Sequence, residues 1–238
     1  ILFEDERVVV VNKPAGMVAH PSGSAFVWSI IALARMQWKD AEMDLCHRLD
    51  RDTSGVMVLT KDKAANKLVK DAFKAGRVHK RYEAICKGSI DWESQECRAK
   101  IGVRGEEIRV QQGVREDGAE AFTKVTVLER KETLTRVSCQ IGTGRTHQIR
   151  VHLEHLGYPI LGDRLYGVKP EVFLHTLQHG QDAWTRERTG APRHALHCAE
   201  MRFPHPDGIE RSVMAPVPED MERWWAKPEC LPHDARVD

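Results

Sequence analysis

The sequence predicts an α+β fold in which much of the sheet is antiparallel. Short apolar runs of strand length are interspersed with segments whose apolar residues recur at a helical period. Between residues 97 and 141, strand-like runs follow one another too closely for the helical crossovers that parallel strands need. The chain has 238 residues, of which 41% are hydrophobic, which is enough to bury the core of one large domain. We therefore expect a single domain over residues 1–238.

The elements of the first part are predicted from apolar runs and the polar residues beside them. Residues 8–11, 56–60 and 82–86 are apolar runs of strand length. Residues 27–36 are predicted to form a helix capped by Ser24. Another helix should begin after Asp62 and end at Gly76. Its apolar residues keep a helical spacing: Ala65, Leu68, Val69, Ala72 and Phe73.

The second part is predicted to contain more strands. These are residues 108–110, 121–128 and 134–141, followed by a helix over 146–156 that Gly157 closes. A hairpin of residues 195–203 and 209–214 is expected around a turn at 204–208, and Pro218 should open a last helix. Residues 168–193 are polar and include Gly180, Gly190 and Pro192, so we expect an irregular excursion from the domain.

Bulk properties give no strong indication of a partner. Lysine plus arginine number 36 and aspartate plus glutamate number 35, so an RNA-binding site would have to come from local clusters. No apolar stretch is long enough to cross a membrane, and the acidic start is unlike a signal peptide. The six scattered cysteines are expected to be reduced, in a cytoplasmic monomer. Because the chain does not begin with Met, we expect a trimmed piece of a longer protein.

The stretch "HRLDRDTSG", residues 47–55, concentrates reactive side chains directly before an apolar strand. Within it, Asp50 could act as a nucleophile or general base if an arginine kept its carboxylate ionised. Neighbouring side chains of an extended stretch point to opposite sides, so the counter-ion of Asp50 should come from elsewhere in the chain. From spacing alone, a turn-capping role for Asp50 is equally supported.

A second cluster, "GTGRTHQIRVH" at residues 142–152, combines two glycines with basic residues at the predicted start of a helix. Helix N-termini favour phosphate groups, which makes Arg145 and His147 candidates for RNA binding. Arg150 could instead pair with Glu154 one turn later, a contact worth only tenths of a kcal/mol. The Gly-x-Gly pattern alone is weak and lacks the lysine of a Walker loop.

The third cluster is Lys80-Arg81-Tyr82, in which an aromatic residue follows two cations. Tyr82 could stack on a nucleobase while Lys80 and Arg81 meet phosphates, although a tyrosine that opens a strand more often packs in the core. Histidines at helical spacing, such as His175 and His179, raise the question of a metal. No third ligand and no H-E-x-x-H motif accompany them, so we expect no metal site.

Taken together, these stretches resemble the RluA-type pseudouridine synthases. "HRLDRDTSGVMVLTKD" (47–62) is similar to the signature around that family's catalytic aspartate, and "GTGRTHQIRVHLEHLGYPILGDRLYG" (142–167) to its second long motif. Three further stretches agree and follow the family's order: "VVVVNKPAGMVAHP" (8–21), "KRYEAICKG" (80–88) and "HALHCAEMRFPHP" (194–206). The resemblance implies the pseudouridine synthase fold, a largely antiparallel bent sheet with flanking helices. It departs from the family at 22–38, at Cys198 and at 168–193.

The resemblance also implies a mechanism that uses no cofactor and no metal. Asp50 would be the nucleophile that initiates cleavage of the N-glycosidic bond of a uridine, and the freed uracil would rejoin the ribose through carbon 5. Arg150 would form an ion pair with Asp50, and Tyr82 would stack on the target uracil. Arg48 would enter the space that the flipped nucleotide leaves. Thr53, Ser54 and Gly55 would shape the turn that presents Asp50, and Gly162 and Asp163 would have a structural role.

We expect the substrate to be structured RNA, with ribosomal RNA favoured over transfer RNA. Two alternatives stay open: an RNA-binding protein of the same fold without catalysis, and an Asp-dependent glycoside hydrolase. The hydrolase would need a second carboxylate nearby, which the motifs do not clearly supply. Many relatives of this type carry an N-terminal S4 domain, and the sequence shows none.

Overall fold

The computed structural model describes residues 1–21, 28–105 and 108–226. The chain divides into two compact units, which we call the first and the second unit. Residues 1–82 and 197–217 form the first unit, and residues 83–196 and 218–238 form the second.

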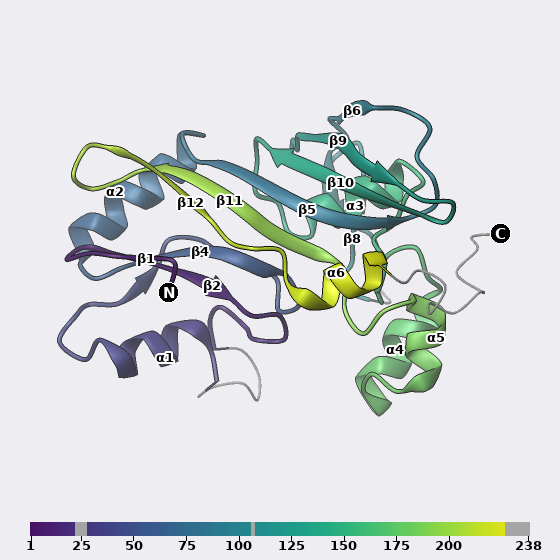
Figure 1. The fold of residues 1–238 in the computed structure, drawn as a ribbon, viewed down its shortest axis with the longest axis horizontal. Helices are drawn as coiled ribbons and strands as arrows, with labels where there is room; N and C mark the ends of the chain where they lie inside the picture. The colour runs from purple at the N-terminus through teal and green to yellow at the C-terminus, as the bar shows by residue number, and fades with distance from the viewer. Residues whose placement is uncertain (22–27, 106–107, 227–238) are drawn as a thin grey trace. The chain divides into compact units, whose positions relative to one another are not determined.

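The first unit is built on strands in the order β1-β2-β4-β11, with β3 also paired to β4 and β12 to β11. Figure 1 shows these strands with helices α1 and α2 beside them. Their bounds are β1 Phe3–Glu4, β2 Val8–Lys13, α1 Ile30–Gln37, β3 Asp44–Leu45, β4 Ser54–Thr60, α2 Lys63–Lys74, β11 Leu196–Pro204 and β12 Glu210–Met214. Strand β5 (His79–Lys87) begins in this unit and continues into the second.

Strand β4 is the centre of the first unit. All seven of its residues are buried, as expected for a strand with neighbours on both edges and a helix on one face. It pairs antiparallel with β2 along its length and parallel with β11, where Gly55 faces Cys198. The chain therefore places a rigid strand directly after residues 47–53, which we call the Asp50 loop.

Replacing Gly55 by Ala should destabilise the protein strongly. Gly55 has a φ of +114°, and a Cβ atom built on it would lie 2.2 Å from the backbone oxygen of Cys198. Backbone atoms paired in a sheet cannot move away cheaply, so we expect a loss of about 3 kcal/mol or more in urea unfolding. Gly208 is a matched control, because its φ is +89° but nothing lies within 4 Å of its Cβ position. Equal losses for Gly55→Ala and Gly208→Ala would contradict the role of close packing.

Helix α2 confirms the predicted helix and most of its buried face. The side chain of Asp62 accepts a hydrogen bond from the Ala65 N–H at 2.7 Å, so it caps the helix as expected. Ala65, Val69 and Ala72 are buried. Leu68, which the periodicity assigned to the same face, is 51% exposed because it lies at the edge of the apolar stripe.

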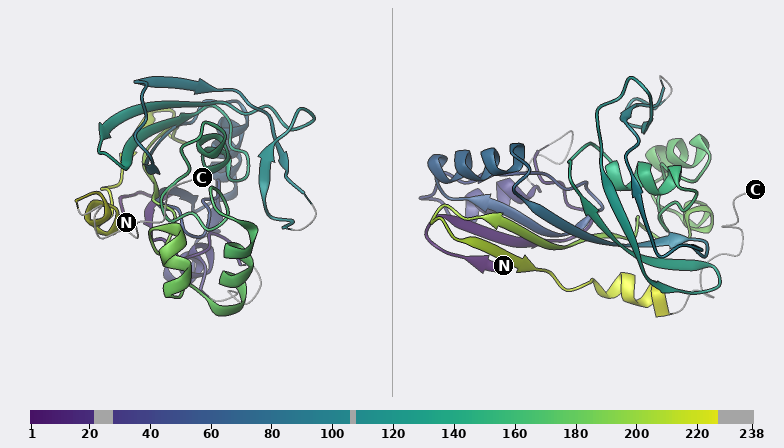
Figure 2. Two further views of the ribbon diagram at one scale, coloured as in Figure 1. Left: turned by 90° about the vertical axis from the view of Figure 1, so that its right-hand side faces the viewer. Right: turned by 90° about the horizontal axis from the view of Figure 1, so that it is seen from above.

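The second unit contains a strand order of β5-β10-β9-β6 and a separate two-stranded pair, β7 and β8. Figure 2 shows these strands and the unit's helices from two further directions. The bounds are β6 Ser94–Cys97, β7 Ile101–Val103, β8 Gln112–Val114, β9 Thr123–Arg130, β10 Leu134–Ile141, α3 Gln148–His155, α4 Pro170–His179, α5 Ala183–Thr189 and α6 Glu219–Ala226.

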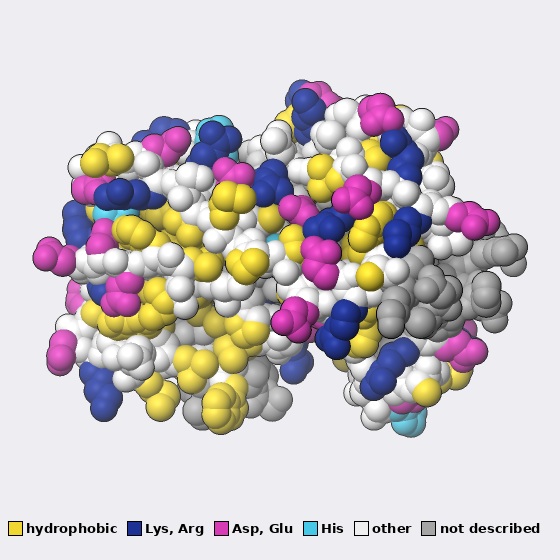
Figure 3. Space-filling view, viewed as in Figure 1, with side chains coloured by type: hydrophobic (Ala, Val, Ile, Leu, Met, Phe, Trp, Pro, Cys, Tyr) yellow, Lys and Arg dark blue, Asp and Glu magenta, His cyan; other side chains and the backbone are white. Residues whose placement is uncertain are grey.

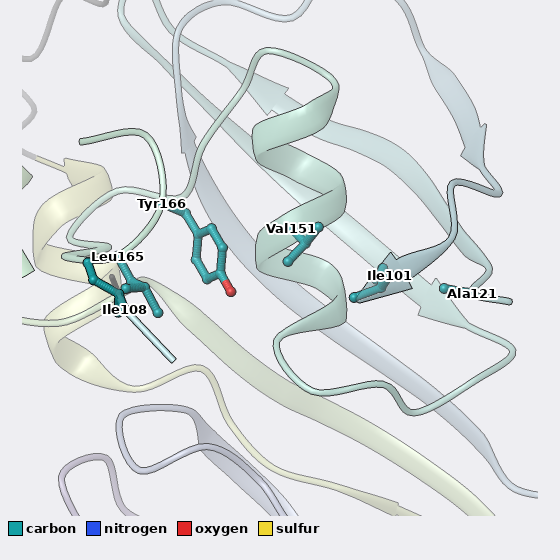
Figure 4. Packing of buried hydrophobic residues seen from close by; sticks show 6 residues of the cluster. All are labelled: Ile101, Ile108, Ala121, Val151, Leu165 and Tyr166. Atoms are coloured by element: carbon teal, nitrogen blue, oxygen red, sulfur yellow. The ribbon is translucent and has the colours of Figure 1, made fainter. Parts of the chain in front are cut away.

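A buried cluster joins α3 to the loops around it. Figure 4 shows the ring of Tyr166 beside the helix that carries Val151. Ile101, Ile108, Ala121 and Leu165 complete the cluster. The prediction of a strand at residues 108–110 is wrong: this segment is a turn, closed by a bond from Gln111 N to Ile108 O, and Ile108 is buried in the cluster.

Two further predictions on helices need correction. The segment 168–193 is not irregular but contains α4 and α5. Pro170 occupies the first turn of α4, and Asp182 caps α5 by accepting from Thr185 N. Helix α1 begins at Ile30, capped by Ser29, because the Ser29 hydroxyl accepts from Ala32 N at 3.3 Å. The expected cap Ser24 lies outside the described residues.

The predicted fold class is confirmed: α+β, with largely antiparallel strands and flanking helices. Among the strand pairs whose register is described, β4 with β11 is the one parallel pair. In the described part of the chain, no helix has the length and apolarity needed to span a bilayer. On the face drawn in Figure 3, basic and acidic side chains are interspersed, in keeping with the near-neutral net charge.

Candidate active site

Hydrogen bonds from a buried lysine, Lys13, hold the Asp50 loop in place. This lysine was not among the predicted site residues. Lys13 has no exposed surface, and its ammonium group donates to the carbonyl oxygens of Pro14, Met17 and Arg51 at 2.8, 2.7 and 2.9 Å. A buried charge must be hydrogen-bonded to be tolerated, so these contacts hold two loops together. The available signal was a lysine two residues after the apolar run 8–11.

Further contacts restrain the same loop. Gly16 N donates to the Arg51 carbonyl at 2.9 Å, and Arg51 Nε donates back to the Gly16 carbonyl at 3.0 Å. Within the loop, Thr53 N donates to the Asp50 carbonyl at 3.2 Å. The side chain of Asp50 is therefore presented from a well-braced backbone, as a reacting group requires.

His47 anchors the start of the loop and is neutral. Its Nε2 accepts a hydrogen bond from Val58 N at 3.1 Å, and its ring packs 4.9 Å from the ring of Phe73. Burial, helped by the nearby charge of Lys80, lowers the pKa of His47 to about 3. An imidazole with this pKa is uncharged near neutral pH, so His47 supports the loop and contributes no positive charge to it.

Tyr82 and Asp50 both belong to the first unit. Tyr82 is 6% exposed on β5, and its pKa is well above the ordinary value, chiefly because of burial. The neighbouring Cys198 and the negative charge of Asp50 raise that pKa further. Tyr82 therefore stays a neutral phenol, which can present a ring face or donate a proton but cannot serve as a base at neutral pH.

The neighbouring strand residues have different surroundings. Lys80 Nζ lies 5.4 Å from the centre of the Phe73 ring, and burial lowers the pKa of this lysine. Arg81 donates through Nε to Glu200 at 3.1 Å, so part of its charge is already matched inside the unit. Arg48 is exposed, in keeping with a side chain that could reach into RNA.

The strand that follows Asp50 is tied to β11 by a buried side-chain bond. Ser54 Oγ and His197 Nδ1 are 2.9 Å apart, and His197 Nε2 lies 3.3 Å from the Ala215 carbonyl. Ser54 and Gly55 belong to β4 and not to a turn, so only Thr53 of the predicted turn-shaping trio lies outside the strand. Their place in the sheet still fixes the direction in which the loop leaves it.

In the second unit, Arg150 and Asp163 form a buried ion pair. Arg150 Nε and one terminal nitrogen bind the two carboxylate oxygens of Asp163 at 2.6 and 2.9 Å. Arg150 is 5% exposed and Asp163 is fully buried. Asp163 also accepts from Leu165 N and Tyr166 N, at 2.9 and 3.2 Å, so it fixes both α3 and the following loop.

The alternative partner of Arg150, Glu154, is engaged elsewhere. Its two oxygens accept from the guanidinium of Arg104 at 3.1 and 2.7 Å. The guanidinium of Arg150 also lies 4.9 Å from the centre of the Tyr166 ring. The expected pairing of Arg150 with Asp50 stays a prediction, whereas the contact with Asp163 is a feature that the sequence analysis missed. A partner thirteen residues away lies beyond the reach of helical spacing.

Arg145 and His147 lie at the start of α3, which begins at Gln148 because His147 has a left-handed φ of 56°. Arg145 is exposed and donates through Nε to the Glu120 carbonyl at 2.9 Å. His147 Nδ1 lies 2.9 Å from the hydroxyl of Tyr166. These contacts hold both side chains at the helix N-terminus, where the sequence analysis placed a phosphate site.

Acid should weaken the protein partly through Asp163. Burial alone would raise the pKa of this carboxyl, but the Arg150 charge and its hydrogen bonds hold the pKa at about 2, below the ordinary 3.8. Its stabilising contribution is therefore complete above about pH 4 and is lost as the pH falls toward about 2. We expect the urea midpoint to fall more steeply over this interval in the wild type than in Asp163→Asn. Parallel pH profiles would contradict this assignment.

Comparisons with known proteins agree with the motifs. The family model for RNA pseudouridylate synthases matches residues 7–155, which include parts of both units. The chain is 37% identical over 230 residues to the ribosomal large subunit pseudouridine synthase D of Xylella fastidiosa, covering 93% of this chain and 66% of that protein. It is 37% identical over 229 residues to the uncharacterized RNA pseudouridine synthase YjbO of Bacillus subtilis, covering 94% of this chain and 74% of that protein. The chain thus spans about two thirds to three quarters of the length of these curated relatives.

Solved structures show the same fold. Human RNA Pseudouridylate Synthase Domain Containing 4 superposes with a TM-score of 0.74 at 27% identity, covering 96% of this chain and 92% of that one. Human RNA Pseudouridylate Synthase Domain Containing 1 gives a TM-score of 0.71 at 26% identity, covering 90% and 82%. The expected enzyme class, an RNA-modifying isomerase, is confirmed at the level of the family. The chain belongs to the RNA pseudouridylate synthase family.

Proposed function

We propose that this chain is the catalytic part of an enzyme that isomerises specific uridines in structured RNA to pseudouridine. The observation that carries the proposal is that Asp50 and the buried, neutral Tyr82 belong to the same unit. Asp50 lies on a loop held by Lys13, and Tyr82 lies on β5, which neighbours β11 in the sheet. The family match over parts of both units supports treating them as one catalytic domain.

The proposed reaction assigns one task to each residue. Asp50 acts as the nucleophile that starts cleavage of the N-glycosidic bond, and Tyr82 stacks on the uracil that turns and rejoins through carbon 5. Arg48 fills the space that the extruded nucleotide leaves, and Arg150 pairs with Asp50 while Asp163 holds Arg150 in place. Uridine and pseudouridine are isomers, so the reaction has no net redox change and needs no metal or cofactor to balance it.

Ribosomal RNA is the first substrate to test, and transfer RNA the second. Curated relatives of this chain are named ribosomal large subunit pseudouridine synthase D, which supports this order. Arg145, His147, Lys80 and Arg81 are proposed to contact the RNA backbone, and such contacts would make the affinity depend on salt. The chain's near-neutral net charge is consistent with local contacts of this kind.

The test is turnover on RNA that carries uridine tritiated at carbon 5, because forming the new bond releases that tritium. Purified protein should release tritium from ribosomal RNA transcripts, and the RNA should contain pseudouridine after digestion. Release of free uracil would instead indicate a hydrolase. RNA binding without tritium release from any ribosomal or transfer RNA would favour the binding protein that lacks catalysis.

A further inference from the structure

Helices α4 and α5 form a pair that the proposed reaction does not use. Figure 1 shows them side by side. Val172 and Thr176 of α4 and Thr185 and Thr189 of α5 are buried, and the hydroxyls of Thr176 and Thr185 are 3.5 Å apart. They occupy the segment 168–193, where the sequence departs from the motifs of the RluA-type enzymes. A surface segment that lies outside the catalytic motifs is a natural place for a contact that helps to select the substrate.

Four side chains of this helix pair form a continuous stack. The rings of His179 and His175 are 4.5 Å apart at an interplanar angle of 35°, and those of His175 and Trp184 are 4.2 Å apart at 39°. The guanidinium of Arg188 lies 3.9 Å from the centre of the Trp184 ring. We call His179, His175, Trp184 and Arg188 the ring stack.

Hydrogen bonds fix the stack before any ligand arrives. His175 Nε2 lies 2.8 Å from Asp182, the residue that caps α5. Arg188 donates to the carbonyl of Trp184, one turn earlier, at 3.1 Å. A preorganised stack loses little side-chain entropy on binding, which favours it as a recognition surface.

The ring stack is partly open to solvent. His179, at the end of the stack, is exposed, while His175, Trp184 and Arg188 are partly buried. The stack thus presents an exposed ring backed by two further rings and a cation. Unpaired nucleobases are bound in proteins by this chemistry, through stacking on aromatic, histidine and arginine planes.

The spacing of His175 and His179 first suggested a metal, and the structure favours stacking. The two rings are 4.5 Å apart and tilted by 35°, and Nε2 of His175 is already engaged by Asp182. In the described residues, no three side chains of His, Cys, Asp or Glu gather to hold a metal ion.

We propose that the ring stack binds an unpaired nucleobase of the substrate RNA on the exposed ring of His179. The inference rests on the proposed function for the identity of the ligand as RNA. It adds a contact outside the proposed catalytic residues, made by a segment in which this chain differs from the RluA-type motifs. The ring stack would therefore contribute to the choice of RNA and not to the chemistry.

The test compares His179→Ala, which removes the ring, with His179→Phe, which keeps a stacking face. A fluorescein-labelled RNA of about ten unpaired nucleotides serves as the probe, with a duplex of the same length for comparison. His179→Ala should weaken binding of the unpaired RNA on the order of tenfold, and His179→Phe should stay within about twofold of the wild type. Exposed His155 in α3 provides the matched control, and His155→Ala should bind as the wild type does.

Kinetics separate this inference from the proposed function. With RNA that the wild type modifies, His179→Ala should raise KM on the order of tenfold and leave kcat unchanged. Unchanged binding in His179→Ala, or equal losses in His179→Ala and His179→Phe, would overturn stacking at the ring stack even if the wild type makes pseudouridine. A wild type that makes no pseudouridine but shows the expected binding differences would instead overturn the proposed function alone.

Discussion

Replacing Asp50 by Asn should abolish the formation of pseudouridine and leave RNA binding nearly unchanged. The substitution keeps the size of the side chain and the backbone contacts of the loop, including the bonds from Thr53 N and from Lys13. It removes the negative charge and the nucleophile, so turnover should fall by about 10⁴-fold or more. Tritium release from RNA tritiated at carbon 5 of uridine measures turnover, and fluorescence anisotropy measures binding.

A matched control distinguishes loss of the nucleophile from a general effect of lost charge. Asp117 is exposed in the second unit and pairs with Arg115 at 2.7 Å, so Asp117→Asn removes one carboxylate at the surface. Its turnover should equal that of the wild type. An Asp50→Asn enzyme that keeps even a tenth of wild-type turnover would remove Asp50 from the proposed role.

Replacing Arg150 by Ala should lower the free energy of unfolding of the protein and should also lower its activity severely. Asp163 is fully buried, and Arg150 supplies two of its hydrogen bonds and its compensating charge. Removing one partner of a buried ion pair leaves the other charge uncompensated, which costs about 3–5 kcal/mol. Urea unfolding followed by circular dichroism measures this loss.

A second substitution tests whether the loss acts through Asp163. In Arg150→Ala/Asp163→Asn the buried charge is gone, while the amide oxygen can still accept from Leu165 N and Tyr166 N. We expect the double variant to recover part of the stability that Arg150→Ala loses. If the urea midpoint of Arg150→Ala equals that of the wild type, the buried pair does not stabilise the second unit as described.

Long periodic segments and apolar runs were predictable because local signals and tertiary packing agree there. Strand β10 has the predicted bounds, residues 134–141, and α2 has the predicted cap. Ile108 was misread because an apolar residue in a turn gives the same signal as one in a strand, and its burial depends on Leu165 and Tyr166, far along the chain.

Helices α4 and α5 escaped prediction for a different reason. They are short, ten and seven residues, and isolated helices of this length are marginal, so most of their stability comes from tertiary packing. Buried threonines and the Asp182 cap stabilise them, and a threonine gives no helical signal in a sequence.

The candidate site likewise has features that the sequence could indicate and features that it could not. Ordered motifs that resemble a family assigned Asp50 and Tyr82 to one site, although the two residues are 32 positions apart in the sequence, and that assignment stays a prediction. The bond between Arg150 and Asp163, and the three carbonyls around Lys13, depend on loops whose course no spacing rule specifies.

The most direct test of the central claim is a transcriptome-wide map of pseudouridine. The protein would be expressed in cells that lack their own synthases of this type, and their RNA compared with RNA from cells that express Asp50→Asn, using carbodiimide modification as the read-out. New pseudouridines with the wild type and none with Asp50→Asn are the expected result and would name the RNA. The same new sites with both proteins would contradict the role of Asp50, and no new site with either would contradict the proposed activity of this chain.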